Sequence, residues 1–229
     1  MSSFAVFASG RGSNFEAILH AKQEGLLQSE LVALVCDQPE APVIEKAKAA
    51  GIPTFVIPLV SAAEASGSSP QSLAERRTLH EERILKALLP FAPRFLVMAG
   101  YMRLLGPTLL GAFAERGEAS GHHRIVNVHP SLLPAFPGVN AYRQAYESGT
   151  HFAGVTVHLV DEKMDHGPIC AQEAFSIRDC ASVDEVEKLG LQIEHRLYPS
   201  TLKWILEEKF TVESASDDRK GNRTRVRPH

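Results

Sequence analysis

The sequence predicts an α/β fold in which helices cover both faces of a mostly parallel β-sheet. Two observations favour the parallel sheet: continuous apolar runs recur over residues 4–128, and helical segments lie between them. A third concerns the later part of the chain, where two β-rich runs lie close together and predict an antiparallel extension. We expect one Rossmann-like domain over residues 1–210 and a flexible basic C-terminal tail over residues 211–229.

The apolar runs that should form parallel strands are short and lack the alternation of a half-buried strand. They lie at residues 4–8, 31–36, 53–57, 95–99 and 125–128. Helical segments are expected at residues 15–22 and 43–50, and Gly51 follows the second as a C-terminal cap. Because strands of this type bury both faces, helices are expected on both sides of the sheet.

The second half of the chain has a different pattern. Runs at residues 153–160 and 169–175 are joined by a short turn, which predicts a hairpin or meander rather than another βαβ unit. A long helix is expected at residues 183–208, where apolar side chains recur at spacings of three and four, with Pro199 interrupting or kinking it. Two polar, Gly-containing stretches, residues 61–72 and 115–123, predict loops, the first of them mobile.

The composition favours a cytoplasmic protein without a nucleic-acid partner. A net charge of −3 and a sequence pI of about 6.4 give no support for nucleic-acid binding. The three cysteines form no C-x-x-C pair, as expected of free thiols in a reducing compartment. The N-terminus lacks the basic region and cleavage site of a signal peptide, and no run reaches the length of a membrane helix. We therefore expect no nucleic-acid or membrane partner.

A glycine-containing turn, residues 9–14, joins the first expected strand to the first expected helix. Glycines permit a tight turn, and the free N–H groups of a helix start favour a phosphate. Ser13 and Asn14 can add side-chain donors. The turn is not the dinucleotide fingerprint, since Phe15 occupies the third glycine position, and it is not a Walker loop. By itself, it is equally well explained as a turn without a ligand.

Asn127 and His129 are the strongest catalytic candidates. In a strand their side chains point to the same side, and they lie at a carboxyl end, where ligands of open α/β sheets bind. Asn127 can donate an N–H group and a protonated His129 another, so together they can stabilise an oxyanion. The alternative is a capped loop that carries a surface histidine.

Asp165 lies in a Gly-Pro turn, where a carboxylate often serves only turn chemistry. Placed beside His129, it would raise the pKa of that imidazole and keep it charged. It could also accept, through water, a proton from an attacking amine. His158 alternates with Thr156 on the following strand, and either faces the same site or is a histidine satisfied within its strand.

Taken together, these segments resemble the glycinamide ribonucleotide formyltransferase family. The matching pieces occur in order over roughly residues 4–210, at 9–14, 99–103, 127–134, 136–138, 154–158, 165–168 and 194–195. The resemblance implies the formyltransferase fold and transfer of a formyl group from 10-formyltetrahydrofolate, as co-substrate, to the amine of glycinamide ribonucleotide in purine biosynthesis. It also implies that no metal is needed and that the chain is a monomer or a homodimer.

The resemblance also implies roles for individual residues. It assigns the catalytic trio to Asn127, His129 and Asp165. It assigns substrate binding to Gly12, Ser13, Asn14 and Glu194. It assigns the folate pocket to Met102, Arg103, Leu104, Leu105, Asp161 and Asp165. It gives Thr156 and His158 the supporting role of holding the Asp165 loop. Leu191 departs from the family, which often has Lys or Gln there, so a substrate contact from that position is not expected.

Four other readings of the same residues are open. A hydrolase could use the trio to deformylate formyl-folate, although water needs no phosphate anchor. A formylase of methionyl initiator tRNA would need a further RNA-binding domain and a more basic body. A metal-dependent hydrolase could use His129, His158 and Asp165 as ligands. A non-catalytic nucleotide-binding module would leave the trio without a role.

Overall fold

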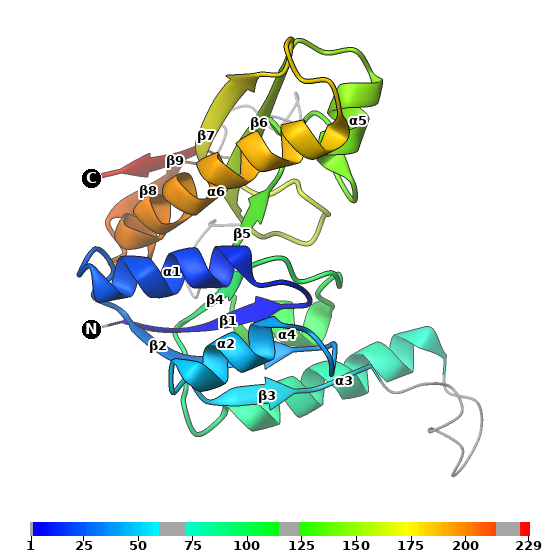
Figure 1. Ribbon diagram of the computed structural model, residues 1–229. Helices are drawn as coiled ribbons and strands as arrows, with labels where there is room; N and C mark the ends of the chain where they lie inside the picture. Colours follow the sequence, from blue (N-terminus) through cyan, green and yellow to red (C-terminus); the bar gives the residue numbers. More distant parts are fainter. Residues whose placement is uncertain (1, 60–71, 115–123, 214–224) are drawn as a thin grey trace.

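The strands of the chain form one mixed sheet. The computed structural model describes residues 2–59, 72–114, 124–213 and 225–229, and within them the strand order is β3-β2-β1-β4-β5-β6-β7-β9-β8 (Figure 1). The parallel part comprises β1 (Ser3–Ala8), β2 (Glu30–Cys36), β3 (Thr54–Val56), β4 (Phe95–Met98) and β5 (Ile125–His129). Next come β6 (Phe152–Leu159) and β7 (Ile169–Ser176), each antiparallel to the strand before it. The predicted α/β class, with its antiparallel extension, is confirmed.

Helices cover both faces of the sheet, as the continuous apolar runs predict. Along β1, Phe4, Val6 and Ala8 pack with α1 (Ser13–Gln23), α2 (Val43–Ala49) and α6 (Val183–Leu206). The alternate residues Ala5 and Phe7 pack with α3 (Leu73–Leu88) and α4 (Pro107–Ala112) on the opposite face. These five residues of β1 are therefore buried whichever way they point.

Two features of the helices differ from the sequence prediction. Helix α3, and the short helices α4 and α5 (Ala141–Glu147), are absent from it. Helix α6 continues through Pro199, so the predicted interruption is wrong. The predicted loops 61–72 and 115–123 lie outside the described residues, apart from Ser72, which caps α3 through a reciprocal pair of hydrogen bonds with Glu75.

The end of the chain also differs from the predicted flexible tail. Strands β8 (Phe210–Glu213) and β9 (Arg225–Pro228) form an antiparallel pair, and one residue pair, Ile169 with Arg225, joins β9 to β7. Residues 211–213 and 225–228 thus extend the sheet, while the rest of the predicted tail, except His229, lies outside the described residues. The domain boundary at residue 210 stays a prediction.

Candidate active site

The glycine turn connects β1 to the start of α1. Gly12 has a φ of 76°, and a Cβ atom there would meet Cγ2 of Val43 at 2.6 Å, so only glycine fits. No side chain among the described residues caps α1, which leaves its first N–H groups for an anion. Ser13 is the first residue of this helix and is partly exposed. Phosphate binding at this turn stays a prediction, and the uncapped helix start leaves donors for it.

Asn14 and Glu194, predicted as substrate-binding residues, are in direct contact. The Asn14 Nδ2 atom donates to Oε2 of Glu194 at 2.6 Å, and the Tyr142 hydroxyl donates to Oε1 at 2.7 Å. Burial raises the pKa of Glu194, while these two hydrogen bonds oppose the shift. A buried carboxylate from α6 therefore stands beside the glycine turn. Tyr142 was missed, because nothing in the sequence around α5 links it to a site 52 residues away.

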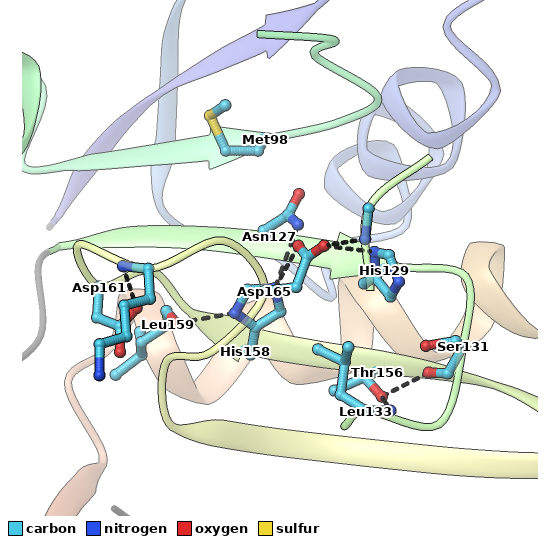
Figure 2. A network of polar contacts seen from close by, with 12 residues as sticks. Met98, Asn127, His129, Ser131, Leu133, Thr156, His158, Leu159, Asp161 and Asp165 are labelled. Atoms are coloured by element: carbon cyan, nitrogen blue, oxygen red, sulfur yellow. Dashed lines mark hydrogen bonds and ion pairs between the residues drawn. The ribbon is translucent and has the colours of Figure 1, made fainter. Parts of the chain in front are cut away.

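The predicted catalytic trio converges at the end of β5. The Nδ1 atom of His129 lies 3.5 Å from Oδ2 of Asp165, and both side chains are mostly buried (Figure 2). Asn127 joins them through His158: its Nδ2 lies 3.2 Å from His158 Nε2, which lies 3.8 Å from Oδ1 of Asp165. Four side chains from β5, β6 and the loop after β6 thus form one polar network (Figure 2).

Hydrogen bonds to main-chain carbonyls define the ring orientations. His158 Nδ1 lies 2.9 Å from the Leu159 carbonyl oxygen, an acceptor, so Nδ1 carries a proton and Nε2 can accept from Asn127. An amide nitrogen has two N–H groups, and the second one of Asn127 is not needed for this bond. His129 Nε2 likewise donates to the Phe136 carbonyl oxygen at 2.9 Å, which turns Nδ1 toward Asp165.

The turns around the trio are held by side chains rather than by a sheet. Asp165 has a left-handed φ of 50°, and its Oδ2 accepts from the Gly138 N–H at 2.7 Å. Thr156 Oγ1 donates to the Ser131 carbonyl oxygen at 2.6 Å and accepts from the Leu133 N–H at 3.1 Å (Figure 2). These contacts place Thr156 under the turn that follows His129, whereas His158 lies 3.8 Å from Asp165 itself. A role of Thr156 in supporting the Asp165 loop stays a prediction.

The residues expected to bind folate divide between two places. Met102, Arg103, Leu104 and Leu105 lie together on the wall of a cavity of about 270 Å³, whose other lining residues are Leu59, Arg77, His80, Tyr101 and Leu109. Asp161 and Asp165 are not on its wall. Asp161 instead accepts from the Lys163 N–H at 2.9 Å and pairs with His166 at 2.7 Å within its own loop. The cavity combines apolar side chains with two arginines, Arg77 and Arg103.

Arg77, His80 and Asp37 are site residues that the sequence interpretation missed. Arg77 and His80 lie on α3, which was not predicted, so their approach to residues 101–105 had no sequence signal. Asp37 did have one, since it comes directly after the buried strand β2, at the carboxyl end where ligands of open α/β sheets bind.

Within the described ranges, no group of three or more His, Cys, Asp or Glu side chains is arranged to hold a metal ion. Within the same ranges, no helix has the length and apolar character needed to cross a membrane.

Comparison with known proteins places the chain in a family. A family model described as formyl transferase matches residues 2–202. The phosphoribosylglycinamide formyltransferase of Bacillus subtilis (strain 168) is 43% identical over 206 residues, covering 90% of this chain and 95% of the relative. The crystal structure of the Bacillus halodurans phosphoribosylglycinamide formyltransferase is 42% identical with a TM-score of 0.76, covering 90% of this chain and 96% of that chain. Glycinamide ribonucleotide transformylase 1 from Symbiobacterium toebii has a TM-score of 0.80 at 32% identity, covering 100% and 94%. The chain belongs to the phosphoribosylglycinamide formyltransferase family of formyl transferases.

Proposed function

We propose that the chain transfers the formyl group of 10-formyltetrahydrofolate to the amine of phosphoribosylglycinamide (glycinamide ribonucleotide), a step of purine synthesis. The observation that carries the proposal is the contact of His129 with Asp165, 3.5 Å apart, beside the amide of Asn127 at the end of β5. The similarity of the chain to phosphoribosylglycinamide formyltransferases supports the same reaction. We place the reaction in the cytoplasm, because the three cysteines are free thiols, as expected in a reducing compartment.

The substrate phosphate would bind the first N–H groups of α1 at Gly12 and Ser13. The uncapped helix start supports this, since it offers donors and a positive dipole end. Glu194 would accept hydrogen bonds from the ribose hydroxyls. A carboxylate has about four acceptor positions, so Glu194 can bind hydroxyls while Asn14 and Tyr142 hold it in place.

The folate would enter the cavity behind residues 102–105. Its leucines and Tyr101 suit a flat aromatic ring system, and Arg77 and Arg103 suit the carboxylates of a glutamate tail. Ser9 donates its main-chain N–H to the Gly100 carbonyl oxygen at 3.0 Å, so the glycine turn and the wall of this cavity are neighbours. This adjacency supports a site where amine and formyl group meet, and positioning alone can contribute several kcal/mol.

Asn127 would donate its second N–H group to the formyl oxygen, where negative charge develops when the neutral amine attacks the formyl carbon. His129 would add an N–H group once a ring nitrogen leaves its present partner, Phe136 or Asp165. Asp165, which lies 3.5 Å from the His129 ring, would hold that ring in place and accept, through water, the proton that leaves the amine. That proton ends on the nitrogen that releases the formyl group, so the products are the formylated amine and tetrahydrofolate. None of the steps assigned to these side chains requires a metal.

The test is an absorbance assay of the purified chain with 10-formyltetrahydrofolate. We expect tetrahydrofolate to form only when phosphoribosylglycinamide is added. Formation of tetrahydrofolate and formate at the same rate without the amine would instead identify a deformylase, and no turnover with either would contradict the proposal.

A further inference from the structure

A buried carboxylate outside the proposed trio holds one of the proposed binding segments. Asp37, directly after β2, is 2% exposed. Its Oδ2 accepts from Arg103 Nε at 2.6 Å and from Gln38 Nε2 at 2.9 Å, and its Oδ1 accepts from Ser9 Oγ at 2.5 Å. Of these donors only Arg103 carries a charge. Because an isolated charge is costly to bury, Asp37 and Arg103 depend on each other.

Ser9 extends this network to the main chain of residues 102–105. While its Oγ donates to Asp37, the same oxygen accepts from the Met102 N–H at 2.9 Å. Asp37 therefore holds the segment at two successive residues: the side chain of Arg103 directly, and the backbone of Met102 through Ser9.

Asp37 itself is not on the wall of the cavity, whereas Met102 and Arg103 both are. A long arginine side chain on a loop has many rotamers, and binding a ligand costs the entropy of selecting one of them. A charge-assisted hydrogen bond to a buried carboxylate selects that rotamer before the ligand arrives. We propose that Asp37 is a positioning residue for the formyl donor, which orders Arg103 and Met102 for folate binding without touching folate; this inference rests on the proposed function.

Asp37→Asn is the informative change, since it keeps the size and one acceptor but removes the charge that holds Arg103. The Michaelis constant for 10-formyltetrahydrofolate should rise about tenfold, the size expected for a lost charge-assisted hydrogen bond. The turnover number and the Michaelis constant for phosphoribosylglycinamide should stay within about twofold, since the trio and the Asn14–Glu194 contact are untouched. Binding of tetrahydrofolate, followed by fluorescence, should weaken by the same factor of about ten.

A second variant and a control complete the test. Ser9→Ala removes the link to Met102 without changing any charge, and should raise the Michaelis constant for the formyl donor alone, by about threefold. Glu173→Gln neutralises a carboxylate of β7 that pairs with Arg196 of α6, and should change neither constant. If Asp37→Asn does not fold, Ser9→Ala decides the question alone.

Two results would overturn the inference. One is an Asp37→Asn variant, or a Ser9→Ala variant, that binds tetrahydrofolate as the wild type does. The other is a parallel rise of both Michaelis constants with a fall in melting temperature, which would show a structural role only. Failure of the proposed function gives a different result: a wild-type chain that binds tetrahydrofolate but transfers no formyl group, in which case the binding comparison still tests Asp37.

Discussion

Removal of the Asn127 side chain tests the proposed oxyanion site most directly. Asn127→Ala deletes the amide nitrogen that lies 3.2 Å from His158 Nε2, and with it the second N–H group assigned to the formyl oxygen. Loss of one preorganised donor at such a site costs about 2.7–4 kcal/mol in the transition state, so kcat should fall about 10²- to 10³-fold. Both Michaelis constants should stay within about threefold, because the donor acts on charge that develops only during the reaction.

The same variant separates chemistry from folding. Asn127 is half-buried and loses one hydrogen bond to another side chain, which should lower the free energy of unfolding by only about 1 kcal/mol. Initial rates from folate absorbance, together with urea denaturation, measure both effects. Gln28→Ala is a matched control, since it removes an exposed amide that donates to the Gly25 carbonyl oxygen. A kcat within threefold of wild type in Asn127→Ala would refute the oxyanion role, as would a loss of rate that only follows unfolding.

Three further changes test other parts of the structure. Gly12→Ala should lower stability by about 1–3 kcal/mol and abolish phosphate binding, because of the left-handed φ and the clash with Val43; unfolding curves and calorimetry with ribose 5-phosphate measure this. Burial raises the pKa of Glu194 above 4.5, so the folded state keeps the carboxyl proton to higher pH than the unfolded state does. The free energy of unfolding should therefore fall as pH rises from 4.5 through the raised pKa. Glu194→Gln should flatten this fall, and a variant whose stability changes with pH as the wild type's does would contradict the assignment. Tyr198→Phe should cost about 1–1.5 kcal/mol in urea denaturation, since the buried hydroxyl lies within 3.1 Å of main-chain oxygens of β4 and β5; a midpoint equal to wild type would count against this.

The strands of the sheet were predictable because their signal is local. Each of β1 to β7 begins and ends within one residue of the apolar run that predicts it. Helix α3 was missed although it is 16 residues long, because charged side chains fill most of its surface and only a few positions, such as Ile84 and Leu88, face the core. The Ser72–Glu75 capping box was the available signal for its start. Strands β8 and β9 are short and largely exposed, so pairing rather than composition determines their conformation.

The site was predictable as a set of residues but not as a set of contacts. Residue types at the ends of β1 and β5, together with the family resemblance, identified Asn14, Asn127 and His129. The contact of Asn14 with Glu194 spans 180 residues. No local sequence pattern predicts that Asn14 and Tyr142 each donate to a different oxygen of this carboxylate. Asp37 was missed because an acidic residue after a strand is common, and its role depends on the position of Arg103, 66 residues away.

The change from parallel to antiparallel pairing explains why the trio forms at β5. The β5–β6 register places Asn127 opposite His158 and His129 opposite Thr156. The Asn127–His158 pair therefore places an amide and an imidazole side by side. In the His129–Thr156 pair, Thr156 holds the turn that follows β5. Because β6 leads directly into the loop of Asp165, the Asp165 carboxylate lies close to both His129 and His158. A register slip of one residue would turn His158 and Thr156 to the other face and leave Asn127 without its partner. The antiparallel extension is thus the part of the fold that assembles the proposed catalytic network.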